Sequence, residues 1–116
     1  MSVTDEIGKY LKKPGCHLLK VTYDLTCKDY SNEESVPTII MCFGTFPHYP
    51  DEEMLEVTFH GCSKIDLYRA FDVIFQPCIL FEDVSDRQYD GLRYYVREAE
   101  DEFSFYCDDI KCRIIE

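Results

Sequence analysis

The residue types best suited to metal binding or covalent catalysis in this chain are its seven cysteines and three histidines. A structural zinc site takes four such ligands, and they usually come in closely spaced pairs such as C-x-x-C. No C-x-x-C occurs here. Cys16 and His17 are adjacent, so on a strand they would face opposite sides. Cys107 and Cys112 could meet across a hairpin, but they would supply only two ligands. We therefore expect no metal ion and no cofactor.

Nucleophilic catalysis would need a thiol or hydroxyl beside a histidine that acts as its base. His17, His48 and His60 are the candidate bases, and none lies in a motif that would determine such a geometry. The motifs G-x-S-x-G and H-E-x-x-H are absent, and five glycines leave little scope for phosphate-binding loops. The sequence therefore predicts a protein that is not an enzyme. A small cysteine-dependent hydrolase is an alternative, which one unusually reactive thiol would support.

The cysteines also bear on the compartment in which the chain works. The N-terminal residues MSVTDEIGKYLKK contain no apolar signal region, and no run approaches the roughly 18 apolar residues of a membrane span. A chain without an export signal stays in a reducing compartment, where thiols remain free. Most cysteines lie in apolar runs such as IIMCF, QPCILF and FSFYC, so we interpret them as small core residues. We expect a cytoplasmic protein that does not enter a membrane.

The charge balance points to a class of partner. Twenty-three acidic residues against twelve basic ones leave a formal net charge of −11. Nucleic acids and anionic membranes bind through lysine and arginine, so neither is an expected partner. A basic protein surface, reached by electrostatic steering, is the complementary partner. The alternative is that the charge only keeps the protein soluble. Neither reading determines the oligomeric state.

Acidic residues cluster beside apolar alternation near the C-terminus, within EAEDEFSFYCDDIKCRIIE. Tyrosine offers contact area and a hydrogen bond at low entropic cost, so nearby tyrosines belong to the same candidate surface. Smaller acidic clusters lie at 51–53 and around 82–86. The predicted partner-binding residues are Glu98, Glu100, Asp101, Glu102, Asp108, Asp109, Tyr95 and Tyr106.

These side chains must be positioned by a mostly β framework. A short helix is expected after Ser2, which has capping-box spacing to Asp5, and Pro14 and Gly15 end it. In the first expected strand, 16–25, apolar residues at 19, 21, 23 and 25 would share one face. Further strands are expected at 38–43, 54–60, 62–68, 78–84, 92–98, 103–107 and 110–115.

Two segments of this framework are less clearly specified by their patterns. The segment 66–76 has apolar residues at helical spacing, which favours a short helix that ends before Pro77, although a strand remains an alternative. In the strand 54–60, Leu55, Val57 and Phe59 should face inward. The junction at 107–110 should be a tight hairpin or a bulge.

The element pattern predicts the fold class. Close spacing and few long crossovers favour antiparallel pairing. We expect one α+β, β-rich domain over residues 1–116, with about seven or eight strands and an N-terminal helix. The sheet would be either two-layered or a single curled sheet with the helix across it.

Four segments of the second half follow one another in an order known from a protein family. They are VTFHG at 57–61, FDVI at 71–74, CILFEDV at 78–84 and FSFYCDDIKCR at 103–113. This order resembles the bacterial immunity protein 50 family, whose members have a V-x-L-x-F-x-G strand, a segment around F-x-x-x-N-x-I, another strand and a terminal F-x-F-x-C-x-x-I-x-V unit. In the first half, His17 matches the family's opening strand.

The resemblance implies a cytosolic antidote that binds a secreted or contact-delivered toxin and blocks its active site. A nuclease toxin must be basic to hold nucleic acid, so an acidic inhibitor could occupy its cleft. The sequence thus predicts a non-enzymatic immunity protein against a nuclease-like bacterial toxin. The alternative from the same physical properties is a phage-encoded protein that mimics DNA, such as an anti-CRISPR protein.

Overall fold

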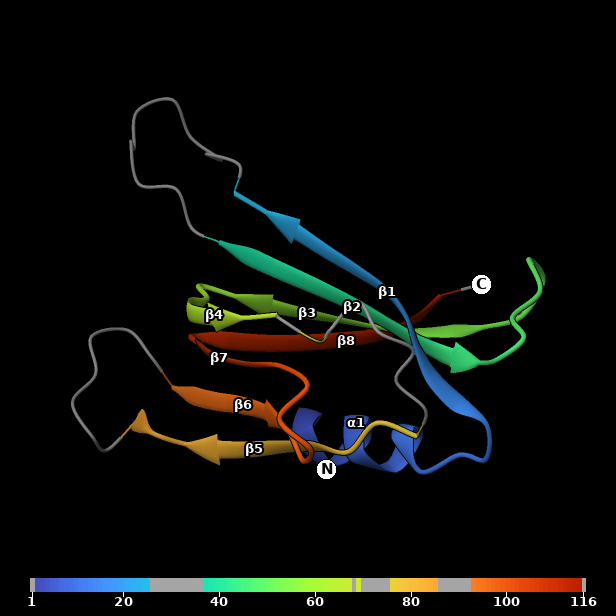
Figure 1. Cartoon of the computed structure of the whole chain (residues 1–116), viewed down its shortest axis with the longest axis horizontal. Coiled ribbons are helices and arrows are strands. Elements are labelled where there is room, and N and C mark those ends of the chain that lie inside the picture. The colour runs from blue at the N-terminus through green and yellow to red at the C-terminus, as the bar shows by residue number, and fades with distance from the viewer. Residues whose placement is uncertain (1, 26–36, 68, 70–75, 86–92, 116) are drawn as a thin grey trace.

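The computed structural model describes residues 2–25, 37–67, 69, 76–85 and 93–115, which form one helix and eight strands (Figure 1). In chain order these are α1 (Val3–Leu11), β1 (Cys16–Asp24), β2 (Thr38–Thr45), β3 (Met54–His60), β4 (Ser63–Asp66), β5 (Ile79–Asp83), β6 (Tyr94–Glu98), β7 (Ser104–Cys107) and β8 (Asp109–Ile115). Every described strand pair is antiparallel. The prediction of a β-rich α+β fold with an N-terminal helix is confirmed.

The strands form two four-stranded sheets, ordered β1-β2-β3-β8 and β4-β7-β6-β5. In Figure 1 the strands β7, β6 and β5 of the second sheet lie below the first sheet, whereas β4 is level with β3, and α1 lies beside β5 and below β8. The helix contacts β3 and β8 of the first sheet. Of the two predicted arrangements, the molecule therefore has the two-layered one.

The core lies between the two sheets and the helix. Phe59 of β3 and Phe105 of β7 meet edge to face, with their ring centroids 4.9 Å apart. Because these strands belong to different sheets, the contact joins the two layers. Ile7 of α1 is fully buried in the same cluster. Leu55 and Val57 are buried alongside Phe59, so the predicted inward face of this strand is confirmed.

The helix begins and ends where its local sequence predicts. Ser2 is the N-cap residue, and its Oγ accepts a hydrogen bond from the backbone N–H of Asp5 at 3.3 Å. Asp5 and Glu6 lie in the first turn, where a negative charge interacts favourably with the helix dipole. The last helical residue is Leu11, three residues before Pro14.

A bulge in β1 overturns one predicted face. Leu18 pairs with Phe43 and Lys20 pairs with Cys42, so Leu19 is an extra residue in the ladder. A bulge shifts the alternation of side chains by one position. As a result Leu18 packs against the core, although its position has the opposite parity to the four residues expected to share one face.

The side chain of Leu19 lies on the opposite face of the sheet from Val21. Its Cδ1 is only 2.8 Å from where a Cβ on Gly44 would lie, so the absence of a side chain at that glycine makes room for it. Val21 packs against the core, whereas Tyr23 and Leu25 are half exposed. The prediction that all four apolar residues share one face is therefore wrong at Leu19.

The junction at 107–110 is a crossing between the two sheets rather than a hairpin. β7 pairs with β4 and β6, whereas β8 pairs with β3 of the other sheet. At the crossing, the backbone N–H of Asp108 donates to the carbonyl oxygen of His60 at 2.8 Å. The prediction of a tight hairpin or a bulge is wrong, because β7 and β8 do not pair with each other but enter different sheets with one residue between them. The predicted helix at 66–76 falls largely on residues 68 and 70–75, which lie outside the described residues.

Candidate functional site

The predicted acidic surface is built on the β6–β7 hairpin. The hairpin turn spans residues 99–103, and it exposes the side chains of Glu100 and Asp101, with Glu102 partly exposed. Asp101 adopts a positive φ of 62°, a conformation that aspartate tolerates better than most residues. We call residues 98–102 the acidic turn.

Glu98 fixes the backbone of the acidic turn through hydrogen bonds. Its side chain is only 4% exposed, and its Oε2 accepts the backbone N–H of Glu100 at 2.7 Å. The backbone of the same residue accepts from Asp101 N–H at 2.9 Å and donates to the carbonyl of Phe103 at 3.0 Å. Three hydrogen bonds therefore fix the turn. Glu98 offers almost no surface to a partner.

Tyr95 and Tyr106 are brought together by the sheet register. They are direct neighbours across the β6–β7 ladder, and their ring centroids lie 4.8 Å apart. Val96 and Phe105, which follow and precede them in the chain, are buried in the core. The tyrosine pair therefore lies on the outer face of the second sheet. Lys64 stacks its ammonium group over the ring of Tyr106 at 5.5 Å.

Asp108 and Asp109 lie at the opposite end of β7 from the acidic turn. Asp108 lies six positions after Glu102, which is about 20 Å along an extended strand. Asp109 accepts the backbone N–H of Ile110 through its Oδ1 at 3.0 Å. The structure therefore separates the predicted residues into two groups. The acidic turn is at one end of the hairpin, and the two aspartates, with the tyrosine pair nearer to them, are at the other.

A few cations near the acidic residues reduce the negative charge locally. Arg97 Nη1 lies 3.8 Å from Asp101 Oδ1 across the mouth of the turn. Both groups are well exposed, so this pair contributes little to stability.

On the neighbouring β5, the hydroxyl and backbone N–H of Ser85 donate to Asp83 and hold the pKa of that carboxyl below its ordinary value.

Most of the described cysteines are poor nucleophiles. Cys16, Cys42, Cys62 and Cys107 are buried, and desolvation raises the pKa of each thiol. The pKa of Cys62 is raised to about 11, because burial disfavours its thiolate. The interpretation of cysteines as core residues is confirmed for these four. It is wrong for Cys78, which is exposed although it lies in an apolar run.

The exposed thiol lines a groove between α1 and β5. The groove has a volume of about 330 Å³, and its wall is formed by Gly8, Leu11, Lys12, Gln76, Pro77, Cys78 and Ile79. This lining contains no imidazole and no carboxylate side chain. Cys78 therefore has no general base within the groove's described wall.

Metal ligands are not brought together in the part of the chain that the structure describes. No group of three or more His, Cys, Asp or Glu residues there could hold an ion. Cys107 and Cys112 belong to strands of different sheets, because the expected hairpin between them does not form. Among the described residues, no helix has the length and apolarity that a bilayer crossing requires.

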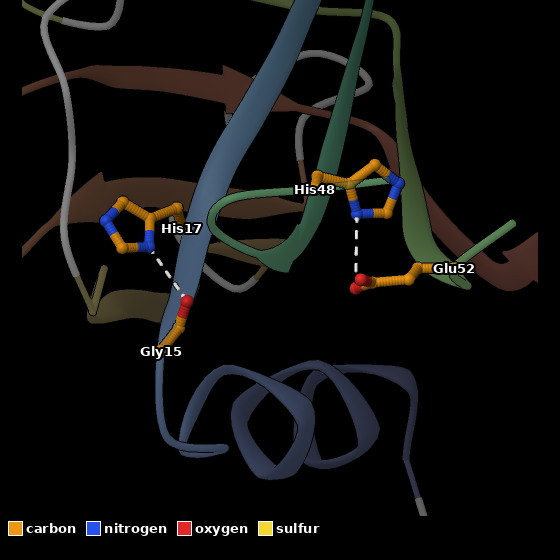
Figure 2. Close-up of polar contacts among 4 residues, drawn as sticks. All are labelled: Gly15, His17, His48 and Glu52. Atoms are coloured by element: carbon orange, nitrogen blue, oxygen red, sulfur yellow. Dashed lines mark hydrogen bonds and ion pairs between the residues drawn. The ribbon is translucent and has the colours of Figure 1, made fainter. Parts of the chain in front are cut away.

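The sequence did not single out an aromatic loop between β2 and β3. It carries Phe46 and Tyr49, whose side chains are 60% and 58% exposed. The imidazole of His48 in the same loop has its Nδ1 4.0 Å from Glu52 Oε2 (Figure 2). The sequence FPHYP could have revealed this loop. Its two prolines cannot continue either strand, so the aromatic residues beside them must lie in a connection.

These features suit protein binding better than catalysis: the acidic turn is held by hydrogen bonds, aromatic residues are exposed, and most of the described thiols are buried. A family model described as Immunity protein PIM8 matches residues 2–113. The chain belongs to the PIM8 immunity protein family. Membership in the PIM8 family makes it a toxin-neutralising protein whose partner is a toxin. Comparison with curated proteins and with solved structures yielded no match.

The PIM8 match bears on the alternatives as well. It supports the predicted immunity protein but not the designation as family 50. An immunity protein acts as an inhibitor rather than as an enzyme, which favours this function over a cysteine-dependent hydrolase. The match also favours toxin neutralisation over a DNA-mimicking inhibitor of phage origin.

Proposed function

We propose that this PIM8 protein neutralises a nuclease-like toxin in the bacterial cytoplasm by covering its basic active site. The observation that carries the proposal is the acidic turn, which presents Glu100 and Asp101 to solvent on a backbone fixed by Glu98. A nuclease cleft must attract phosphates, so it carries lysine and arginine. Carboxylates on a rigid turn can occupy the positions that those phosphates would take.

The net charge of −11 extends this local argument to the encounter between the two proteins. Opposite net charges raise the rate of association well above that of neutral partners. A fast encounter matters for an antidote, because the toxin must be captured before it acts. Asp108 and Asp109 form a second acidic group at the far end of β7, and the tyrosine pair adds aromatic contact area near them.

The proposal can be tested with the toxin whose gene adjoins the gene for this chain. Co-expression should restore growth, and the purified pair should associate about tenfold more slowly at about 500 mM than at about 50 mM NaCl. If no neighbouring gene product is neutralised, and the chain retains no basic protein at moderate salt, the proposal is wrong.

Comparing the toxin binding of three double variants, each lacking two negative charges, shows which acidic group contacts the toxin. Glu100→Gln with Asp101→Asn tests the turn, and Asp108→Asn with Asp109→Asn tests the crossing. Asp5→Asn with Glu6→Gln on α1 is the matched control, because it changes net charge equally. At least one of the first two should weaken binding by about tenfold more than the control. Equal effects of all three would mean that only net charge matters, which contradicts a contact at either group.

A further inference from the structure

The loop between β2 and β3 exposes two large aromatic side chains that lie outside the buried core. Phe46 and Tyr49 are 60% and 58% exposed, and they lie three residues apart. Exposed phenylalanine gains little of the free energy that its burial would supply. A single exposed aromatic side chain is common on protein surfaces, but two on one short loop are a candidate surface for contact with another molecule.

The loop is held in one conformation by the chain around it. The backbone N–H of Phe46 donates to the carbonyl oxygen of Gly15 at 3.2 Å, and Glu52 N–H donates to the carbonyl of Tyr49 at 3.0 Å. The ring of Phe46 packs on that of His17, with centroids 5.1 Å apart. The Nδ1 of His17 donates to the carbonyl oxygen of Gly15 at 2.8 Å, and Figure 2 draws this contact as a dashed line. The aromatic residues are therefore presented before any partner arrives, which lowers the entropic cost of binding.

Three acidic residues belong to the same loop as the two rings. Asp51, Glu52 and Glu53 follow Tyr49 after one residue, Pro50. Lys13 Nζ lies 3.6 Å from Glu53 Oε1, and it is the only lysine or arginine in an ion pair with this loop among the described residues. The surface that complements such a loop has an apolar recess with a rim of lysine and arginine.

Hydrogen bonds connect the base of this loop to the acidic turn. Cys16 lies opposite Thr45 at the start of the loop, and its carbonyl accepts the N–H of Gln76 at 2.8 Å. Two residues further on, the carbonyl of Cys78 accepts the N–H of Ala99 at 2.8 Å. By contrast, Asp108 is bonded to His60, at the end of β3 remote from the loop. The hydrogen bonds through Gln76 and Cys78 therefore connect the loop to the acidic turn and not to the pair Asp108 and Asp109.

We propose that Phe46 and Tyr49 form the aromatic anchor of the toxin interface, inserting into an apolar recess rimmed by basic residues on the toxin. The inference rests on the proposed function, because it takes the toxin as the partner. It adds a contact that neither net charge nor the acidic turn requires. The anchor governs how long the complex lasts, whereas the carboxylates govern how fast it forms.

The test uses the purified, catalytically inactivated toxin whose gene adjoins the gene for this chain. Phe46→Ala and Tyr49→Ala should each raise the dissociation constant by about tenfold or more, mainly through faster dissociation. Tyr23→Ala is the matched control, because Tyr23 is 50% exposed and lies at the other end of the β1–β2 pair. It should change the constant by less than about twofold. Thermal unfolding of each variant checks that the fold is retained.

A second measurement needs no substitution. Nitration of tyrosines in the free chain and in the complex, followed by peptide mass mapping, should show Tyr49 protected by the toxin and Tyr23 unprotected. If the wild-type chain binds the toxin but Tyr49 stays reactive and both alanine variants bind normally, the anchor is wrong and the proposed function survives. If the wild-type chain does not bind this toxin, the proposed function fails first.

Discussion

Glu98 and Glu100 are two positions apart in an acidic run, and the fold gives them different tasks. The first is buried and accepts a backbone hydrogen bond from the second, whose own carboxylate faces solvent. Residue type and spacing made both of them candidates for partner binding. Burial gives Glu98 the supporting role, because a buried carboxylate cannot reach a partner, and it leaves Glu100 as the residue that we propose for the contact.

Residue-scale chemistry also predicts which thiols react. At pH 7, iodoacetamide should modify Cys78 first among the described cysteines, because it is exposed. Cys62, whose pKa is about 11, should react at least about 100-fold more slowly, since its thiolate is scarce and its side chain is buried. Peptide mass mapping over a time course measures both rates. Equal rates at the two positions would contradict the burial of Cys62.

At the scale of elements, the β6–β7 hairpin depends on one side chain for the shape of its turn. Glu98→Ala should lower the free energy of unfolding by about 2 kcal/mol, because Glu100 N–H loses its acceptor and a small cavity forms. Glu98→Gln keeps an acceptor oxygen and should cost less. Urea denaturation measures these changes. Glu100→Ala is the exposed control, and if it costs as much as Glu98→Ala, the supporting role is wrong.

The strand pattern was largely predictable, and its exceptions have local causes. β3 alternates as expected because Leu55, Val57 and Phe59 face one core. β1 departs from its pattern because a bulge at Leu19 reverses the parity along the strand. That bulge depends on space above Gly44 in the partner strand, which no property of residues 16–25 reports.

For the whole molecule, buried thiols predict a loss of stability at alkaline pH. Thiols that are neutral in the fold ionise near pH 8.5 once the chain unfolds. Because burial raises the folded pKa of Cys62 to about 11, its contribution is present below pH 8.5 and is lost as pH rises toward 11. The free energy of unfolding should fall across this range, by roughly 3 kcal/mol from Cys62 alone.

Cys62→Ala and Cys78→Ala separate this effect from the ionisation of other groups. Urea denaturation at pH 8 and at pH 11 should show a smaller fall for Cys62→Ala than for the wild-type chain. Cys78→Ala should show the same fall as the wild type, because its thiol is exposed in the fold. An unchanged fall in Cys62→Ala would show that this thiol does not remain protonated in the folded state.

By itself, the sequence determined the β-rich class, the capped N-terminal helix, the excess of acidic residues and the absence of a recognisable catalytic motif. These features are local or compositional, so they do not depend on which strands meet. Only the tertiary structure decided that β7 and β8 enter different sheets, that Tyr95 lies against Tyr106, and that Phe46 and Tyr49 remain exposed. The reason is physical: strand pairing and burial arise from contacts between segments far apart in the chain, which a local pattern does not encode.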